Sequence, residues 1–383
     1  MARTELVRTL LPPVTDFRPT VCTVDLAAIR HNVRALAPPR AQMMAVVKAN
    51  GYGHGAEPVG RAALAAGATW LGVALVEEGI RLRDAGIGAP ILVLTQFPPG
   101  SEGAALGAGL TPTVYTSEGL ARLAAAAAGR SIGVHVKIDT GMHRVGLDPA
   151  RALEFVADAT RMGLEIEGLW THFATSEELG DPFTGLQLER FADVVASLRG
   201  AGVRPRYLHA ANSAAAMAVP ASHFDIVRLG LAIYGLSPAA GLPGADALWP
   251  AMRWTSKVAA VRRLPGGERI SYGLRYRLDR ASTIATVPVG YADGYSRLLS
   301  ETGEVLIGGR RRRIAGTVTM DQLMVDCGDD PVAEGNDVVL MGRQGDEEIT
   351  AEELASRIGT ATYEVVCQVS ERVPRRYEDR DAE

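Results

Sequence analysis

Lys48 is the first residue whose type and position suit covalent chemistry. It ends the apolar run AVVK and is followed by a glycine-rich segment, Ala49 to Gly55. A lysine shielded from water at the end of a buried strand loses its proton more easily and can act as a Schiff-base nucleophile. The alternative is a lysine whose stem lies along apolar surface with its amine in water. The residue alone favours this alternative, and the glycines alone indicate only a flexible loop.

A second basic cluster lies in HVKIDTGMHRVG. Lys137 falls inside an apolar stretch, where a buried cation needs an anionic partner or a modification that removes its charge. Arg144 follows in a glycine-containing turn and is suited to hold a carboxylate or a phenolate. A surface ion pair between Arg144 and Asp139 explains the same pattern equally well.

Polar residues also end the later apolar runs. His172 follows LWT and His209 lies in YLHAAN, and a lone histidine is more often a hydrogen-bonded core residue than a functional one. Ser213 directly precedes an alanine-rich stretch, so it is predicted to cap a helix whose N-terminus also suits phosphate. Arg228 and Gly230 end the next run, where a glycine permits close approach of the backbone. Two such elements on adjacent strands favour a phosphate site.

The tyrosines of the C-terminal third carry no chemical signal of their own. Tyr272 precedes a predicted strand, and VPVGYADGYSR contains Tyr291 and Tyr295. Tyrosines of a β domain usually pack, so all three are interpreted as structural. VTMDQLMVD and TYEVVCQVSERVPR are interpreted as strands with polar neighbours.

Between Met43 and Ser237 the chain alternates short β-branched runs with longer stretches of helical period. Eight strands alternating with helices predict a (β/α)8 barrel of the TIM type, with a doubly wound sheet as the structural alternative. The carboxyl ends of barrel strands meet at one face, where such enzymes place their chemistry. The predicted strands are MMAVVKA, WLGVALV, PILVLT, TPTVYT, IGVHVKI, IEGLWTHF, RYLHAAN and FDIVRLG. The predicted helices include EPVGRAALAAG, VEEGIRLRDAG, SEGLARLAAAAAG and PARALEFVADATRMG.

The pattern changes near Leu248, after which strand-like runs are joined by tight, glycine-rich turns. This predicts a mostly antiparallel β domain with one inserted helix, residues 351–358, preceded by the capping residue Thr350. We therefore divide the chain into a barrel, residues 17–244, and a β-strand domain, residues 245–383. The early strand CTVDL fits either domain.

The composition limits the classes of protein to which this chain can belong. The chain has 383 residues, of which 47% are hydrophobic and 22% charged, as expected for a globular protein of two domains. A net charge of −4 argues against a general nucleic-acid binder, so the run Arg310–Arg313 is predicted to be a solvated turn or a strand edge. Three cysteines without metal-ligand spacing indicate a reducing compartment and no metal site, and no apolar run has membrane-spanning length. We expect a cytoplasmic protein; Met1 to Asp16 carry no interpretation.

Nine segments together strongly resemble the alanine racemase family. They occur in the family's order and extend over nearly the whole chain. AVVKANGYGHG is highly specific by itself, and the joint occurrence is more so. Thr319 departs from the family, which frequently has cysteine there. The segments are AVVKANGYGHG, HVKIDTGMHRVG, EGLWTHFATSEE, HAANSAA, VRLGLAIYGLSP, ISYGLRY, VPVGYADGYSR, VTMDQ and TYEVVCQVSERVPR.

The resemblance implies roles that spacing alone does not supply. Lys48 would form the internal aldimine with pyridoxal 5'-phosphate and act as the base on one face of the substrate. Tyr272 would be the base on the other face, contributed by a partner subunit and hydrogen-bonded by His172. Arg228 would pair with the pyridine nitrogen of the cofactor, and Lys137 would be a carbamylated lysine (N6-carboxylysine). Five residues would bind the cofactor phosphate: Tyr52, Ser213, Gly230, Leu231 and Tyr363.

Three further residues would lie at the substrate end of the site. Arg144 would contact the phenolic oxygen of the cofactor and the substrate carboxylate, while Tyr291 and Met320 would come from the other subunit. The implied activity is a two-base interconversion of L- and D-alanine by a homodimer with shared active sites, supplying D-alanine for peptidoglycan. Three alternatives stay open: a racemase of serine or of broader specificity, a barrel decarboxylase with the same cofactor, and a non-catalytic carrier of pyridoxal phosphate. The carrier would lack the β domain.

Overall fold

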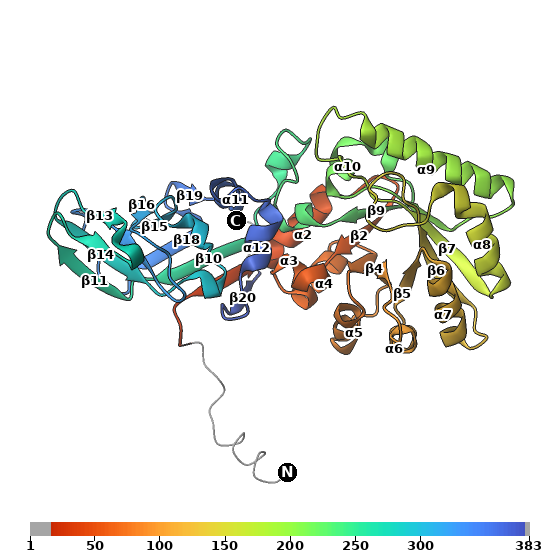
Figure 1. Cartoon of the computed structure of the whole chain (residues 1–383), viewed down its shortest axis with the longest axis horizontal. Helices are drawn as coiled ribbons and strands as arrows, with labels where there is room; N and C mark the ends of the chain where they lie inside the picture. Colours follow the sequence, from red (N-terminus) through yellow and green to blue (C-terminus); the bar gives the residue numbers. More distant parts are fainter. Residues whose placement is uncertain (1–16, 380–383) are drawn as a thin grey trace, which may run out of the picture. The chain divides into compact units, whose positions relative to one another are not determined.

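The computed structural model describes residues 17–379 (Figure 1). The stretch Met1 to Asp16, which carried no interpretation, lies outside the described residues. The chain forms two compact units. One is Asp25–Ala251, and the other joins residues 17–24 to Met252–Tyr377. The strand predicted from CTVDL therefore belongs to the second unit.

The first unit is a nearly closed barrel of eight parallel strands, which confirms the predicted (β/α)8 fold. Each strand is short, rich in aliphatic residues and largely buried, as expected for a parallel sheet covered by helices. The order around the sheet is β8-β7-β6-β5-β4-β3-β2-β9. The strands are β2 (Gln42–Val46), β3 (Trp70–Val73), β4 (Ile91–Gln96), β5 (Thr111–Val114), β6 (Ile132–Lys137), β7 (Leu164–Trp170), β8 (Tyr207–His209) and β9 (Ile226–Leu229).

Single backbone bonds rather than a regular ladder link the segments of β8 and β9. Asp225 N–H donates to the Leu208 carbonyl at 3.0 Å, and Arg228 N–H donates to the Ala211 carbonyl at 3.0 Å. The second bond fixes the backbone of Arg228 beside the chain that leaves β8. The interruption of the ladder thus lies beside Arg228, a polar residue singled out from the sequence.

Helices follow the strands along the chain, and Figure 1 shows α5 to α8 on the outside of the barrel strands. The four helices predicted from sequence are confirmed as α4, α5, α7 and α8. The helices of this unit are α2 (Leu26–Ala35), α3 (Lys48–Tyr52), α4 (Ala56–Ala65), α5 (Val76–Asp84), α6 (Glu102–Gly107), α7 (Ser117–Ala127), α8 (Ala152–Arg161), α9 (Phe183–Gly200) and α10 (Ser213–Ala218).

A cluster of large side chains from five different strands fills part of the barrel. Met44, Trp70, Leu92, Tyr207 and Ile226 are each at most 8% exposed. Burying one such side chain contributes roughly 1.5–3 kcal/mol to folding. The barrel interior is therefore packed with side chains, and we expect the functional polar residues at the ends of the strands.

The second unit is built on a mostly antiparallel sheet, as predicted. Its main strand order is β11-β14-β17-β16-β15-β18-β10-β1-β20. Its strands are β1 (Val21–Asp25), β10 (Met252–Lys257), β11 (Ala260–Leu264), β12 (Arg269–Ile270), β13 (Tyr276–Arg277), β14 (Ser282–Val287), β15 (Glu304–Ile307), β16 (Arg310–Ile314), β17 (Leu323–Asp326), β18 (Asp337–Gln344), β19 (Glu347–Ile349) and β20 (Arg375–Glu378).

Two helices of this unit lie between β19 and β20. α11 (Ala351–Ile358) is the predicted helix, and the Thr350 hydroxyl caps it by accepting the Glu353 N–H at 3.1 Å. α12 (Thr362–Gln368) is a helix where TYEVVCQVSERVPR was interpreted as a strand, so that interpretation was wrong. Its buried residues are Val365 and Val366, and valine itself favours strands, which explains the wrong interpretation.

The arginine run forms strand β16, which pairs with β15 on one side and β17 on the other. The predicted turn or sheet edge was therefore wrong. An interior strand tolerates the charges because carboxylates reach them from separate segments. Arg311, for example, forms ion pairs with three glutamates: Glu304, Glu347 and Glu353.

No helix within residues 17–379 is both long and apolar enough to cross a membrane. Over the same range, histidine, cysteine and acidic residues form no group able to hold a metal ion. Cys22 and Cys327 are buried, and Cys367 is exposed.

Candidate active site

Lys48 follows the first barrel strand, β2, after one intervening residue, and begins a left-handed turn of backbone. The φ angles of Ala49, Asn50 and Tyr52 are 52°, 52° and 50°. Each such non-glycine residue costs roughly 1–2 kcal/mol, so the surroundings must hold this turn in place. Lys48 is half-buried, with its Nζ 6.0 Å from the centre of the Tyr52 ring. The structure therefore gives Lys48 a defined backbone setting rather than a flexible loop.

The other predicted barrel residues also lie at or just beyond the carboxyl ends of strands. Lys137 ends β6, His172 follows β7, Ser213 begins α10 after β8, and Arg228 lies in β9. Because the strands are parallel, these positions share one end of the barrel. The structure thus brings these backbone positions to one end of the barrel.

Arg228 is 3% exposed and lies at the centre of a polar network. Its guanidinium donates to the carbonyls of Thr171 and Ala210, both at 2.9 Å. It also donates to Nδ1 of His209 and Nδ1 of His172, both at 3.2 Å. Burial lowers the pKa of Arg228 to about 9, which leaves the guanidinium protonated at neutral pH. Arg228 is thus a fixed, buried cation.

The histidine tautomers follow from the arginine, which can only donate. Nδ1 of His172 and Nδ1 of His209 therefore accept, and the proton of each neutral ring sits on Nε2. His209 Nε2 then donates to His135 Nδ1 at 2.9 Å. Burial, followed by nearby positive charge, lowers the pKa of His172 well below its ordinary value, so this ring is neutral and offers an Nε2–H. His172 and His209, which the sequence showed as lone histidines, therefore belong to one hydrogen-bonded network with Arg228 and His135.

Lys137 is 4% exposed, with its Nζ 4.6 Å from the centre of the Trp170 ring. Burial, together with the positive charges of Arg144, Arg228 and Lys48, lowers the pKa of Lys137 to about 8, although Asp139 acts in the opposite direction. Arg144 is exposed, and no ion pair joins it to Asp139 in the described part of the chain. The Asp139 carboxylate instead accepts the backbone N–H groups of Gly141 and His143. The surface ion pair considered from sequence is therefore absent.

Ser213 has a different role from the helix cap predicted for it. The cap of α10 is Asn212, whose side chain accepts the Ala215 N–H at 3.0 Å. The Ser213 hydroxyl, 4% exposed, instead accepts the Gly230 N–H at 2.9 Å. Leu231, next in the chain, is buried. The two elements predicted to suit phosphate are thus hydrogen-bonded to each other.

Gly230 leaves room for the hydroxyl of Tyr52. A Cβ at this position would lie 2.5 Å from Tyr52 Oη. We expect Gly230→Ala to lower the free energy of unfolding by about 1–3 kcal/mol, because the buried ring has to shift. Urea denaturation measures this. Gly185→Ala is the matched control: a Cβ at that position in helix α9 meets nothing within 4 Å, so no destabilisation is expected there. Equal midpoints for the two variants would contradict the close contact.

The second unit presents Tyr272, Tyr291 and Met320 on linked loops. Thr317 Oγ1 donates to the Tyr272 carbonyl at 3.0 Å, and the Tyr291 N–H donates to the Thr319 carbonyl at 3.0 Å. The three side chains are 75%, 42% and 54% exposed, in that order. Tyr272 and Tyr291 are thus surface residues, not the packing residues that the sequence pattern suggested.

The remaining two tyrosines named from the sequence, Tyr295 and Tyr363, lie in different settings. Tyr295 is 1% exposed and packs edge-on against Trp254, with ring centres 5.8 Å apart, as interpreted from sequence. Tyr363, assigned to the cofactor phosphate by resemblance, lies half-buried in helix α12.

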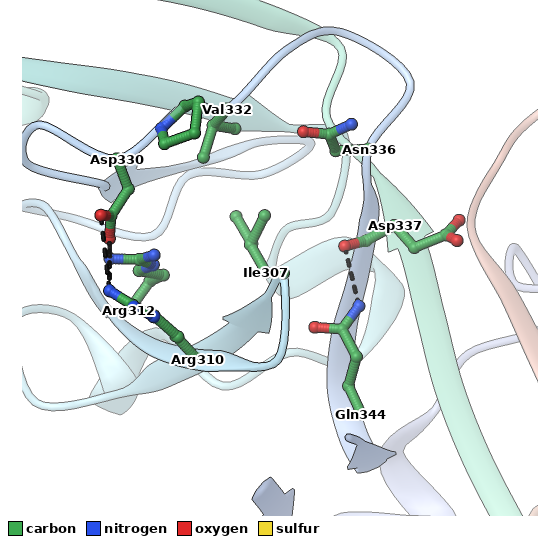
Figure 2. Close-up of a pocket in the computed structure, with 10 residues that line it drawn as sticks. Ile307, Arg310, Arg312, Asp330, Val332, Asn336, Asp337 and Gln344 are labelled. Atoms are coloured by element: carbon green, nitrogen blue, oxygen red, sulfur yellow. Dashed lines mark hydrogen bonds and ion pairs between the residues drawn. The ribbon is translucent and has the colours of Figure 1, made fainter. Parts of the chain in front are cut away.

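A hollow of about 430 Å³ in the second unit is a competing location for a site. Figure 2 shows Asp330 beside Arg310 and Arg312 on one side of it, and Gln344 beside Asp337 on the other. Its lining contains none of the predicted site residues. Because its arginines already pair with Asp330, we assign it no chemistry.

Sequence reasoning missed three residues that shape the barrel site. His135 stands two residues before Lys137 in β6, so strand alternation could have placed both on one face. Trp170 carries both Lys137 and Arg228 over its ring, the latter with Cζ 4.8 Å from the ring centre. Glu78 binds the backbone beside Lys48, which no local pattern indicates.

Comparison with known proteins agrees with this geometry. Residues 24–238 match the alanine racemase N-terminal domain, and residues 251–377 match the alanine racemase C-terminal domain. An alanine racemase of Symbiobacterium thermophilum is 52% identical over 371 residues, covering 94% of this chain and 97% of the relative. One from Frankia casuarinae is 45% identical over 376 residues, covering 96% and 98%.

Solved structures give the same result. The crystal structure of alanine racemase from D-cycloserine-producing Streptomyces lavendulae has a TM-score of 0.90 at 41% identity, covering 96% of this chain and 98% of that one. The Bacillus anthracis alanine racemase, solved with bound L-Ala-P, has a TM-score of 0.89 at 39% identity, covering 96% of each chain. A barrel with a basic carboxyl end, followed by this β unit, thus defines an isomerase of amino acids. The chain belongs to the alanine racemase family.

Proposed function

We propose that this protein interconverts L-alanine and D-alanine through two opposed bases, with pyridoxal 5'-phosphate as cofactor. The observation that carries the proposal is the placement of Lys48 at the polar end of the barrel in a chain of this family. Racemisation removes the Cα proton from one face and delivers a proton to the other, so it needs a group on each side. Lys48 Nζ would serve one face, and Tyr272 of the partner subunit would serve the other.

The basic end of the barrel supports a phosphorylated cofactor. Lys48, Arg144 and Arg228 all lie near enough to Lys137 for their charges to lower its pKa. Such an excess of cations favours an anionic ligand. When bound, pyridoxal phosphate makes the Cα–H of an amino acid acidic by withdrawing the remaining electron pair into its ring.

Individual residues would hold the parts of this cofactor. Lys48 would bind its aldehyde carbon, and the protonated Arg228 would donate to its ring nitrogen. Because a guanidinium keeps its proton, the ring nitrogen would stay unprotonated. Arg144 would donate to the phenolic oxygen and to the substrate carboxylate. The phosphate would be held by Tyr52, Ser213, Gly230, Leu231 and Tyr363.

The neutral His172 would hold Tyr272 through its Nε2–H, since its Nδ1 is already taken by Arg228. Tyr291 and Met320 of the partner subunit would close the substrate end of the site. This arrangement makes the active unit a homodimer, and the exposure of Tyr272, Tyr291 and Met320 on one set of linked loops supports it. We further propose that the protein works in the cytoplasm and supplies D-alanine for peptidoglycan.

Lys137 would carry a carboxyl group on its amine. The ammonium first loses one proton to solvent. The neutral amine then attacks the carbon of CO2, an N–C bond forms as one C–O π bond breaks, and a second proton leaves, so a buried cation becomes an anion near Arg144. A pKa of about 8 makes the neutral amine accessible near physiological pH.

We expect ¹³C-labelled bicarbonate to give one protein-bound carbamate NMR signal that grows as the pH rises through about 8. The chain has only three lysines, Lys48, Lys137 and Lys257, so the signal is readily assigned. Lys137→Met should remove it, and the control Lys257→Met should leave it. A signal that survives Lys137→Met would refute the modification at this residue.

A chirally resolved assay of the purified, cofactor-loaded protein tests the function. L-alanine and L-serine are incubated separately, and the D-enantiomer is followed to equilibrium. The proposal expects an equal mixture from alanine, reached faster than from serine. Faster conversion of serine would change the substrate and keep the mechanism. No racemisation of either amino acid would favour the decarboxylase or carrier alternatives.

A further inference from the structure

The left-handed turn that begins at Lys48 is stabilised partly by its own hydrogen bonds and partly by a side chain from another helix. Along the turn, Gly51 N–H donates to the Val47 carbonyl at 2.8 Å, and Gly53 N–H donates to the Ala49 carbonyl at 3.0 Å. From helix α5, Glu78 Oε1 accepts the Ala49 N–H at 2.6 Å. That nitrogen belongs to the peptide that joins Lys48 to Ala49. The carboxylate thus contacts the first peptide of the left-handed turn.

The same carboxylate also fixes its own helix. Glu78 Oε2 accepts the N–H groups of Ala74 and Leu75, at 2.8 and 3.1 Å. The two oxygens are therefore divided between the start of α5 and the Lys48–Ala49 peptide. Bonds from an N–H to a charged carboxylate are shorter and stronger than neutral ones. A neutral amide at this position has one accepting oxygen, so it cannot serve both sides in the same way.

We propose that Glu78 is a positioning residue: its carboxylate orients the Lys48–Ala49 peptide, keeps the following turn left-handed, and so aims the Lys48 amine. This inference rests on the proposed function of Lys48. The turn needs such a restraint, because Ala49 and Tyr52 adopt positive φ angles that L-residues rarely take without one. An anchor on a neighbouring helix supplies the restraint from a second element of the barrel.

Glu78→Gln and Glu77→Gln form a matched pair of variants. Glu77 is exposed and stands in the same first turn of α5, so both changes remove one negative charge from the same helix start. We expect Glu78→Gln to lower kcat for alanine by about 10- to 100-fold, since small misplacements of a reacting group cost this much, with a smaller change in KM. Glu77→Gln should keep the wild-type values. Equal losses in the two variants would overturn the proposal.

Amide hydrogen exchange of the cofactor-free protein gives a readout independent of activity. We expect residues 49–53 to exchange faster in Glu78→Gln than in Glu77→Gln or the wild type, by roughly tenfold or more. Unchanged exchange over 49–53, with faster exchange only in α5, would make Glu78 a simple helix cap and overturn the proposal. If the wild type fails to racemise alanine while the exchange difference persists, the proposed function fails and the anchoring stands.

Adding Ala49→Gly to Glu78→Gln tests the route of the effect. Glycine adopts positive φ without the steric cost, so it needs less restraint. We expect the double variant to recover part of the lost kcat, whereas no recovery would contradict a backbone route. Should Glu78→Gln fail to fold, Glu78→Asp replaces it, with the same expected directions because the shorter side chain cannot bridge both sides.

Discussion

Lys48→Ala is expected to abolish alanine racemisation, with a loss of at least about four orders of magnitude in kcat/KM, because both the covalent anchor and one base are removed. The rate of D-alanine formation from L-alanine, at equal concentrations of folded protein, measures this. Borohydride reduction followed by peptide mass spectrometry should place the cofactor adduct on the Lys48 peptide of the wild type and find no adduct in Lys48→Ala.

The scarcity of lysine makes this test sharp. Lys257 forms an ion pair with Asp337 on the sheet of the second unit and is half exposed, so Lys257→Ala is the matched control and should retain activity and adduct. An adduct on Lys137 or Lys257, or substantial activity left in Lys48→Ala, would remove Lys48 from the centre of the mechanism.

Mixing Tyr272→Phe with Lys48→Ala is expected to restore activity that neither variant has alone. If each site takes Lys48 from one chain and Tyr272 from the other, half of the sites in a mixed dimer are intact. Random reassociation of equal amounts should then recover about a quarter of the wild-type activity per chain in this two-fold assembly. Native mass spectrometry of one tagged variant confirms that mixed dimers form.

A control mixture uses Tyr377→Phe in place of Tyr272→Phe, since Tyr377 is an exposed tyrosine on β20. That variant should be active by itself. Mixed dimers of Tyr272→Phe and Lys48→Ala that show no activity would eliminate the shared site and place Tyr272 in another role.

The strands of the barrel were predictable because each is a short aliphatic run bounded by polar residues or glycine, and their alternation with helices implied the closed sheet. Helix α12 was not, because its valines favour strands locally although the segment folds as a helix. The arginines of β16 were misplaced for a related reason. Their partners, such as Glu353 in α11, come from distant segments that only the folded chain brings together.

The candidate site, too, was predictable from the sequence only in part. Lys48 and Arg228 could be singled out as polar residues that end apolar runs, whereas their partners could not. Glu78 reaches the peptide beside Lys48 from another helix, and the Ser213 hydroxyl accepts a bond from Gly230 rather than capping its own helix. Hydrogen bonds between non-adjacent segments depend on tertiary geometry, on which local spacing carries no information.

Strand β1 has a consequence for how the chain is made. It pairs with β10, whose first residue Met252 is synthesised roughly 230 residues later. At ~5–20 residues per second, translation takes on the order of ten to fifty seconds to supply that neighbour. Throughout this interval VCTVD has no sheet to join, although the barrel sequence after it is being completed. The barrel unit is thus synthesised between the two parts of the β unit. For most of the time of synthesis β1 is an unpaired strand that can pair with a wrong strand.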